Sequence, residues 1–531
     1  MGPLLLLLAA CIRWEETFDS SPDETGVPDT HDSDTNTGPD SDTGTGPTDI
    51  PWIVQTAVDH DTWSELDLEV ATYAITAANP TGYRDQEGGD PLFYVVRPQE
   101  MTDEARPVLL WLHGSAQGVD DDEDRNRNCG TDGIASTVED ALDHPVVAAE
   151  IARRDWLWVL PTNTWCDYWT GQGADDAVDT SHHGYEHVQT ILDALESGFD
   201  RNKSDPTAVR AWGTSIGGAG VLTNATGPDG SARFVAIVDD SGPVSPSTWY
   251  SLPSQDPYLD HVYGGPPYDE EGDPSEFYDN YARADGPIRI TAGELSTPLF
   301  VTYNAYDGLV PERQNTTLES ALEAIYDPAD IPYFIHDFDH HAPGTMFHIQ
   351  TGYERPPMSY TNRAAFSFLD GRTVAFIEAE DTCLGACTTI AESGTGSLEA
   401  SSANSGGSAV VHEDGEAEGV FYAGELPVTL PRGVPLTILP VLTVTGLDAS
   451  YDDESIVTLE LKQDGKSLLS FTMTGADFAP ESLDASHAEL FAQLDATTWD
   501  VESAPEGTVT LQAFSHGRGG VVLDGFWFFY E

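Results

Sequence analysis

Short apolar runs alternate with longer amphipathic stretches along the chain from about Trp52 to Arg372. This alternation predicts a mostly parallel sheet with helices on its faces, because each buried strand is followed by a crossover helix. The apolar runs predict strands at residues 92–96, 108–112, 157–160, 209–212, 234–238, 299–303 and 333–338. The amphipathic stretches predict helices at residues 138–141, 184–195, 217–224, 314–325 and 363–369. The predicted fold class of this region is therefore α/β, with a doubly wound sheet.

After Arg372 the pattern changes to strand-length apolar runs separated by Gly, Ser and Asp turns. Such a succession is typical of an all-β sandwich or jelly roll. It predicts strands at residues 374–377, 409–411, 428–430, 436–444, 456–461, 467–472, 508–513 and 521–529. We therefore predict two domains, an α/β domain over residues 51–372 and a β-sandwich domain over residues 373–531.

The first fifty residues follow neither pattern. Residues 4–8 are apolar, and Leu8-Ala9-Ala10-Cys11 resembles a bacterial lipobox, although no Lys or Arg precedes the apolar run. Residues 15–50 are almost entirely Asp, Thr, Gly, Pro, Ser and Glu, so they bury too little apolar area to fold. We predict a signal peptide over residues 1–11, lipidation of Cys11 and a disordered acidic tether over residues 12–50. The protein is then expected at the cell surface, as a bacterial outer-membrane lipoprotein held to the membrane only by its lipid.

The charge of the chain narrows the choice of partners. Lys and Arg number 22 against 91 Asp and Glu, and the formal net charge is -69 at pH 7. This balance argues against nucleic acid and anionic lipid surfaces as partners, because both would be repelled. Acidic runs inside the globular part, such as residues 120–124, are interpreted as solvated surface.

Four cysteines remain when Cys11 is set aside. An even number in an exported chain favours disulfides, and the natural pairs are Cys129–Cys166 and Cys383–Cys387. A zinc site is the alternative, but no second cysteine pair or nearby set of histidines matches one.

The pentapeptide Gly213-Thr214-Ser215-Ile216-Gly217 stands between an apolar strand and a predicted helix. G-x-S-x-G in that context is the nucleophile elbow of an α/β-hydrolase, where a sharp turn lifts the serine hydroxyl above the sheet. The flanking glycines are needed because their backbones lie in a cramped turn beside the neighbouring strand. Ser215 is therefore the predicted nucleophile.

A serine nucleophile needs a base and an acid that orients the base, and in α/β-hydrolases these follow the serine in the order acid, histidine. Asp307 comes just after the predicted strand 299–303, and His340 and His341 follow the predicted strand 333–338. We predict Asp307 as the acid and one of the two histidines as the base. Asp239 and Asp240, which follow the strand 234–238, are lesser alternatives for the acid, and a turn aspartate is the ordinary interpretation of Asp307.

The oxyanion formed during acyl transfer needs two backbone N–H donors. One is expected at Ile216, directly after the nucleophile, and the other in the loop after the strand 108–112, where Ser115 is the candidate. His113 in the same loop is interpreted as a structural turn residue.

The segment 107–117 and the segment 205–218 resemble the oxyanion loop and the elbow of the group that contains polyhydroxybutyrate depolymerases and feruloyl and acetylxylan esterases. The matching features are Asp205-Pro206 before the strand and Ser215-Ile216-Gly217-Gly218 at the elbow. The run His340-His341-Ala342-Pro343-Gly344 is similar to the group's His-x-Trp-Pro-Gly element, which favours His340 as the base. The stretch Cys166-Asp167-Tyr168-Trp169 resembles the group's Cys-Trp-Asn-Trp, with different residues between its ends.

The resemblance covers roughly residues 90–370 and implies a secreted serine carboxylesterase that forms an acyl-enzyme and needs no cofactor. Trp165, Tyr168 and Trp169 either line the alcohol or acyl pocket or are core aromatics. The expected substrate is an esterified polysaccharide or similar polymer. A polyester depolymerase or a peptidase of the same fold is the alternative among enzymes, and a non-catalytic surface binding protein is the alternative from another class.

The second domain begins with Ile377-Glu378-Ala379-Glu380 and ends with a strand that contains Asp524. It resembles a carbohydrate-binding jelly roll, in which the matching acidic residues hold a structural calcium. The resemblance implies Glu378, Glu380 and Asp524 as calcium ligands, and outward-facing strand residues are the alternative interpretation.

Overall fold

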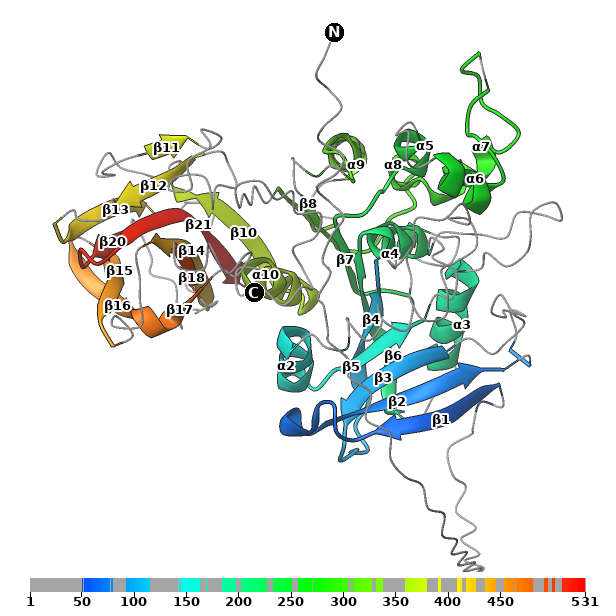
Figure 1. Cartoon of the computed structure of the whole chain (residues 1–531), viewed down its shortest axis with the longest axis horizontal. Helices are drawn as coiled ribbons and strands as arrows, with labels where there is room; N and C mark the ends of the chain where they lie inside the picture. The colour runs from blue at the N-terminus through cyan, green and yellow to red at the C-terminus, as the bar shows by residue number, and fades with distance from the viewer. Residues whose placement is uncertain are drawn as a thin grey trace, which may run out of the picture. The chain divides into compact units, whose positions relative to one another are not determined.

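Nine strands form one sheet in the order β1-β2-β3-β5-β4-β6-β7-β8-β9 (Figure 1). The strands β4 to β9 run parallel to one another. The strands β1, β2 and β3 are antiparallel and extend the sheet beyond β5. The bounds are β1 Ile53–Asp59, β2 Leu68–Ile75, β3 Leu92–Pro98, β4 Arg106–Leu112, β5 Leu157–Pro161, β6 Ser204–Thr214, β7 Ala236–Asp240, β8 Leu299–Tyr303 and β9 Tyr333–Asp337.

The computed structural model describes only part of the 531-residue chain, and every residue it describes lies in the unit Pro47–Glu531. The described residues are 50, 52–76, 78–79, 92–114, 142, 145–162, 169, 184–196, 202–226, 233–250, 256–269, 271–303, 307, 309–326, 331–337, 359–379, 390–392, 408–412, 417–425, 435–445, 453–463, 465–480, 491–494, 499–501 and 509–530. Within them, no helix has the length and apolarity needed to cross a membrane.

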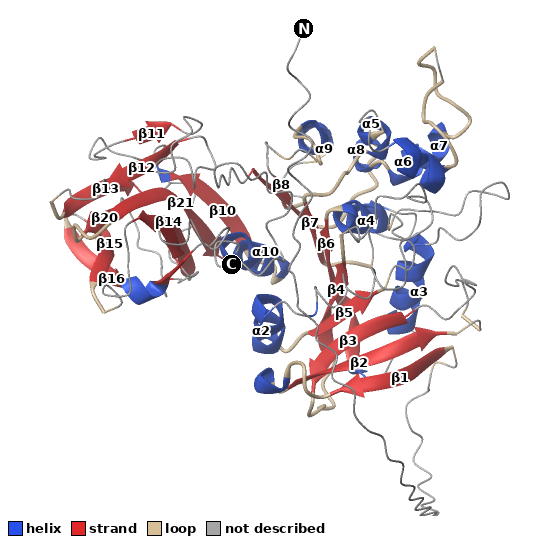
Figure 2. Ribbon diagram, in the orientation of Figure 1, coloured by secondary structure: helices blue, strands red, loops and turns tan. Residues whose placement is uncertain are grey.

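Helices cover both faces of the nine-stranded sheet (Figure 2). The helices α2 and α10 pack on one face, and α3, α4, α6, α8 and α9 pack on the other. The helices are α2 Pro145–Arg154, α3 Gly184–Glu196, α4 Ile216–Thr226, α5 Pro246–Trp249, α6 Asp256–Tyr263, α7 Tyr278–Ala284, α8 Gly286–Thr291, α9 Arg313–Ile325 and α10 Ser359–Leu369. This arrangement confirms the predicted α/β class and the mostly parallel, doubly wound sheet.

The strand β4 shows why its sequence is apolar throughout. Leu109 and Trp111 belong to the core under α2 and α10, whereas Val108, Leu110 and Leu112 belong to the core under α3 and α4. Successive side chains of a strand point to opposite faces, so a strand covered on both sides has no exposed position.

All seven predicted strands of this region are present, and four of the five predicted helices correspond to α3, α4, α9 and α10. The predicted helix 138–141 lies outside the described residues. The prediction did not include β1, β2, α2 or the helices α5 to α8 between β7 and β8.

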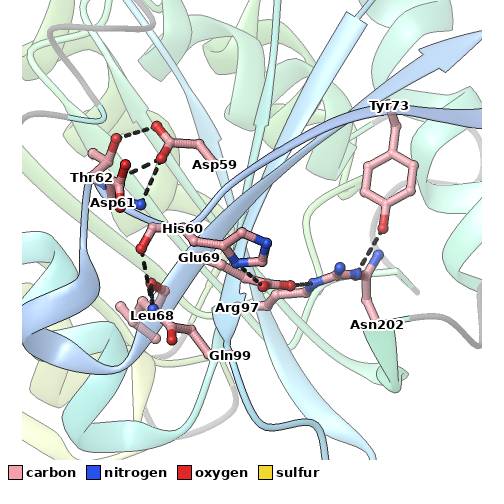
Figure 3. A network of polar contacts seen from close by, with 10 residues as sticks. All are labelled: Asp59, His60, Asp61, Thr62, Leu68, Glu69, Tyr73, Arg97, Gln99 and Asn202. Carbon is pink, nitrogen blue, oxygen red and sulfur yellow. Dashed lines mark hydrogen bonds and ion pairs between the residues drawn. The ribbon is translucent and has the colours of Figure 1, made fainter. Parts of the chain in front are cut away.

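The edge of the sheet at which the parallel strands begin holds a buried ion pair between Arg97 and Glu69 (Figure 3). These residues face each other across β2 and β3, and Arg97 Nε lies 2.7 Å from Glu69 Oε1. The other carboxylate oxygen of Glu69 lies 2.9 Å from His60 Nδ1. Arg97 also donates to the Tyr73 hydroxyl at 2.9 Å and to the side-chain oxygen of Asn202, which stands just before β6. These contacts link the antiparallel strands to the start of the central parallel strand.

The described residues after Arg372 form strands in two antiparallel sheets. One has the order β11-β12-β21-β14-β18-β17, with β10 paired to β21 and β19 paired to β14, and the other has the order β13-β20-β15-β16. Along β20, Val509, Leu511 and Ala513 are buried while Thr510 and Gln512 are partly exposed, as in a strand with one covered face. The strands are β10 Thr373–Glu378, β11 Ile390–Glu392, β12 Ser408–His412, β13 Gly419–Glu425, β14 Leu436–Thr445, β15 Ser455–Gln463, β16 Lys466–Thr474, β17 Phe478–Pro480, β18 Phe491–Leu494, β19 Trp499–Val501, β20 Val509–Ser515 and β21 Gly520–Tyr530.

The strand β21 contacts both the other β-sheet and the nine-stranded sheet. Phe526 packs on Tyr422 of the other β-sheet, with ring centroids 5.4 Å apart. Its neighbour Trp527 packs on Phe334 of β9 at 5.5 Å and on His336 at 4.5 Å. The β-sheets and the edge of the nine-stranded sheet therefore share one continuous apolar cluster. The change from helices to strands falls between α10 and β10, while the domain boundaries and the jelly-roll topology stay predictions.

Candidate active site

The predicted catalytic residues follow neighbouring parallel strands. Ser215 comes directly after β6, Asp307 comes four residues after β8, and the two predicted histidines come after β9. The strands β6, β7, β8 and β9 are adjacent and parallel, so the residues that follow them gather at the same edge of the sheet. The topology thus brings the described Ser215 and Asp307 to the edge where α/β sheets bind their ligands.

Ser215 has the strained conformation expected of a nucleophile elbow. Its φ is 54°, in the left-handed region that few residues other than glycine adopt, and its N–H donates to the Asp240 carbonyl at 2.8 Å. A Cβ on Gly213 would lie 1.9 Å from the Gly217 carbonyl oxygen, and one on Gly217 would lie 2.0 Å from the Leu112 carbonyl oxygen. Glycine is needed at both positions because backbone lies where a side chain would start. The sharp turn that the elbow predicts, with a strained serine between two glycines at the junction of β6 and α4, is therefore present.

The loop after β4 lies directly against the serine. A Cβ on Gly114 would be 3.3 Å from Ser215 Cβ, which is tight van der Waals contact. Ile216 begins α4, so its N–H is one of the backbone donors at a helix N-terminus that no intrahelical bond uses. Ser115, the predicted second oxyanion donor, lies outside the described residues. Its neighbour Gly114 nevertheless puts the start of that loop beside Ser215.

Asp307 is buried and accepts two backbone hydrogen bonds on the same oxygen. The N–H of Leu309 donates to Oδ1 at 2.7 Å and the N–H of Val310 donates to Oδ1 at 3.0 Å. These bonds fix the carboxylate by one oxygen in a turn. Asp307 would accept these bonds whether it is the catalytic acid or an ordinary turn aspartate, so the geometry is compatible with either interpretation.

Burial makes His113 a neutral residue beside the elbow. Its Nδ1 donates to the Gly114 carbonyl at 2.6 Å, and burial lowers the pKa of His113 to about 4. The indole N–H of Trp169 donates to the carbonyl of His113 at 2.9 Å. This geometry supports the interpretation of His113 as a structural turn residue.

Trp169 is fully buried, and a Cβ on Gly220 of α4 would lie 2.3 Å from Trp169 Cβ. It packs against α4 and holds the loop after β4 through His113. These contacts favour the core alternative for Trp169 over the pocket alternative. Trp165 and Tyr168 lie outside the described residues.

Two acidic residues end β7, next to the elbow. Asp239 Oδ1 accepts from the N–H of Gly242 at 2.9 Å, and a Cβ on Gly218 of α4 would lie 2.1 Å from the same oxygen. Asp239 Oδ2 is buried without a hydrogen-bond partner among the described residues. Burial raises the pKa of Asp239 to about 7, although the bond from Gly242 acts in the opposite direction. Asp240 Oδ1 instead accepts from the Thr302 hydroxyl at 2.9 Å.

His340 and His341 lie outside the described residues, and so do Cys11, Cys129, Cys166, Cys383, Cys387 and Glu380. The histidine that the structure does describe on β9, His336, is buried between Trp527 and Phe376. Burial lowers the pKa of His336 to about 3, so this imidazole is neutral and faces the β-sheets.

The backbone brings two of the three predicted calcium ligands to adjacent strands. Glu378 of β10 pairs with Gly525 of β21, next to Asp524. Asp524 is the extra residue of a β-bulge, because Val441 pairs with Gly525 and Leu442 pairs with Leu523. Among the side chains that the structure describes, no group of three or more His, Cys, Asp or Glu is arranged to hold a metal. The side chains of Glu378 and Asp524 are not among them, so the calcium site stays a prediction.

The sequence did not predict the residues that contact the turn of Asp307, Leu309 and Val310. Gln314 and Trp249 form hydrogen bonds between the segment after β7 and the residues after β8. Nothing in the sequence marks them, because Gln314 belongs to an ordinary amphipathic helix and Trp249 to a helix of four residues. Asp239 was noted as an acid alternative, but its packing on Gly218 becomes evident only in three dimensions.

The chain matches no family model and no curated protein. Among solved structures, S-formylglutathione hydrolase from Agrobacterium tumefaciens is 14% identical with a TM-score of 0.37, and the match covers 54% of this chain and 89% of that one. Acetyl xylan esterase from Paenibacillus sp. R4 is 11% identical with a TM-score of 0.39, over 60% of this chain and 88% of that one. Prolyl oligopeptidase B from Galerina marginata is 15% identical with a TM-score of 0.34, over 51% of this chain and only 33% of that enzyme. At these low scores the fold assignment rests on the strand order and the elbow.

Proposed function

We propose that this protein is a serine carboxylesterase with Ser215 as its nucleophile. The observation that carries the proposal is the φ of 54° at Ser215, in a turn where Gly213 and Gly217 leave no room for a side chain. Strain of this kind costs about 1–3 kcal/mol and persists mainly where function needs it. The position of the serine between β6 and α4 presents its hydroxyl at the edge of the sheet.

In the proposed reaction, Ser215 attacks the ester carbonyl while His340 or His341 takes its proton. Asp307 orients the imidazole and stabilises the imidazolium that forms. The N–H groups of Ile216 and Ser115 bind the oxyanion, and collapse of the tetrahedral intermediate releases the alcohol and leaves an acyl-enzyme. Water then attacks the acyl group with the same histidine as base, which releases the acid and restores the serine.

The proposed substrate is an ester group on a polysaccharide or a related polymer, acted on outside the cell. This part rests on the resemblance of the elbow and oxyanion segments to feruloyl and acetylxylan esterases and on the apolar run before Cys11. The two β-sheets after Arg372 are proposed to hold the enzyme to its polymer, with a structural calcium at Glu378, Glu380 and Asp524. The pairs Cys129–Cys166 and Cys383–Cys387 are proposed disulfides.

Hydrolysis of p-nitrophenyl acetate by the full chain tests the proposal. Ser215→Ala is expected to lower kcat/KM by about 10³-fold or more, because it removes the nucleophile. Ser241→Ala is the matched control, since Ser241 follows the next strand, is also buried and has a φ of 58°. Equal activity of the two variants would refute the proposal.

Parallel His340→Ala and His341→Ala variants identify the base, since only one of them should abolish hydrolysis. The substrate class is tested by binding of the Ser215→Ala chain to insoluble xylan and to polyhydroxybutyrate granules. Retention on xylan alone supports the polysaccharide, and retention on the granules alone supports a polyester depolymerase.

A further inference from the structure

The amide of Gln314 joins the helix after β8 to the segment after β7. Gln314 is fully buried in α9, where its Oε1 accepts from the N–H of Ser245 at 2.8 Å. Its Nε2 donates to the Thr248 hydroxyl, also at 2.8 Å. Both ends of this buried amide are therefore used, and each bond would leave a buried polar group unpaired if it broke.

A second bond reaches the turn that carries Asp307. The indole N–H of Trp249 donates to the carbonyl of Leu309 at 2.8 Å, while the N–H of Leu309 donates to Asp307 Oδ1 at 2.7 Å. Trp249 itself is 6% exposed and belongs to the apolar core under the sheet. The peptide group between Leu309 and Val310 is thus bonded to both: its N–H donates to Asp307, and its carbonyl accepts from the segment after β7.

That segment is anchored on its far side as well. The hydroxyls of Ser245 and Ser247 donate to Asp285 Oδ2 at 2.5 Å and 3.0 Å. Asp285 Oδ1 accepts from the N–H of Ile288 and so caps the start of α8. Residues 245–249 therefore form a brace, held by α8 on one side and by Gln314 and Leu309 on the other.

We propose that Gln314 and Trp249 are positioning residues that hold Asp307 at the distance its histidine requires. The proposal rests on the proposed esterase, in which Asp307 orients the base. A displacement of about 1 Å in a catalytic group costs on the order of 100-fold in rate. Loss of the bonds that hold the turn should therefore lower the rate of hydrolysis measurably. Without the brace, the turn keeps its own bonds to Asp307 Oδ1 but loses its attachment to the segment after β7.

The pH profile separates this role from a general loss of stability. A carboxylate held against an imidazolium raises the pKa of the histidine, so a displaced Asp307 lowers it and moves the acid limb of kcat/KM to lower pH. Among the described residues, Asp285 and Arg313 are the charged groups that bond to the brace, the second through its guanidinium to the Thr248 carbonyl at 3.0 Å, and Asp239 and Asp240 end the strand that precedes it. The variants leave these groups in place, so a shift of the limb reports on Asp307.

Gln314→Leu is the test variant and Asn315→Leu its matched control. Asn315 is the next residue of α9 and is 1% exposed, but neither polar atom of its amide has a hydrogen-bond partner among the described residues. For p-nitrophenyl acetate, Gln314→Leu is expected to lower kcat/KM about tenfold and to move the acid limb down by about half a pH unit, within the range of carboxylate effects. Asn315→Leu is expected to leave the limb unchanged.

Trp249→Phe keeps a buried aromatic side chain but removes the indole N–H and with it the bond to Leu309, so it should shift the limb in the same direction by less. This variant decides the question if Gln314→Leu does not fold. An unshifted limb in the folded variants, with hydrolysis still dependent on Ser215, would refute the positioning role alone. Hydrolysis that survives Ser215→Ala would instead refute the proposed esterase together with this inference.

Discussion

The nine-stranded sheet has one edge where its parallel strands begin and an opposite edge where they end. Both edges bury ionisable side chains, but the hydrogen bonds and ion pairs of these side chains differ. Where the parallel strands begin, Arg97 and Glu69 pair at 2.7 Å, and His60 and Tyr73 extend the pair on either side. Where the strands end, Asp239 is buried with one oxygen unpaired among the described residues, and Ser215 has a positive φ. The first edge pairs the charge of Glu69, whereas the second retains an acid with a raised pKa; a strained positive φ occurs at both edges, at Lys203 and at Ser215. Such features cost stability and cluster where proteins bind or react.

Removal of one partner of the ion pair should have the largest effect. Arg97→Met leaves the Glu69 carboxylate buried without its guanidinium, so the free energy of unfolding is expected to fall by roughly 3–5 kcal/mol. The site lies at the opposite edge, and kcat/KM per folded molecule should not change. Urea denaturation followed by activity at low denaturant measures both.

Two companion variants test the cause of that loss. Arg97→Met combined with Glu69→Leu removes both charges and should recover most of the stability. His60→Ala removes a partner of Glu69 whose side chain is 65% exposed, and it should cost about 0–1 kcal/mol. If Arg97→Met costs no more than His60→Ala, the buried pair contributes no more than a surface pair.

Asp239 should make the stability of the protein depend on pH. Its pKa is about 7 in the folded state against an ordinary 3.8, so the folded state binds this proton more tightly than the unfolded state. Stability from this group is complete below about pH 4 and is lost as pH rises to about 7, in total roughly 4 kcal/mol.

Asp239→Asn removes that proton equilibrium. The stability difference between the parent and this variant, measured by denaturation from pH 4 to 8, should move in the variant's favour as pH rises. Asp269→Asn, in an exposed surface turn, is the control and should show no such trend. A constant difference for Asp239→Asn would mean that Asp239 is ionised throughout.

The smallest expected effect concerns the strained serine. Glycine adopts a positive φ without cost, so Ser215→Gly should be more stable than Ser215→Ala by about 1 kcal/mol, and both should be inactive. Lys203 has a φ of 52° at the opposite edge, before β6. Lys203→Gly should gain a similar amount relative to Lys203→Ala and keep full activity. Thermal unfolding and ester hydrolysis of the four variants show whether strain is tied to function at only one edge.

The central strands were predictable because each is an apolar run bounded by turn residues. The strand β1, Ile53–Asp59, was missed because most of its residues are polar or exposed at the edge of the sheet. The helices α5 to α8 were missed because they have four to eight residues each, too few for a helical period to appear. The strand β6 begins at Ser204, five residues before the predicted start at Val209. The prediction began too late because residues 204–208 are mostly polar.

For the candidate site, Ser215 was found from the sequence because an elbow requires small residues at fixed spacing, and the order of strands then suggested Asp307. Three-dimensional packing was needed for everything that acts across strands. The closeness of Gly114 to Ser215, the burial that changes the pKa of Asp239 and the hydrogen bonds of Gln314 all join residues about 20 to 100 positions apart. The local pattern of the sequence therefore determined the strands, the elbow and the predicted nucleophile. Only the tertiary structure decided which polar groups are paired, strained or braced, because burial and hydrogen bonding depend on neighbours that chain order does not reveal.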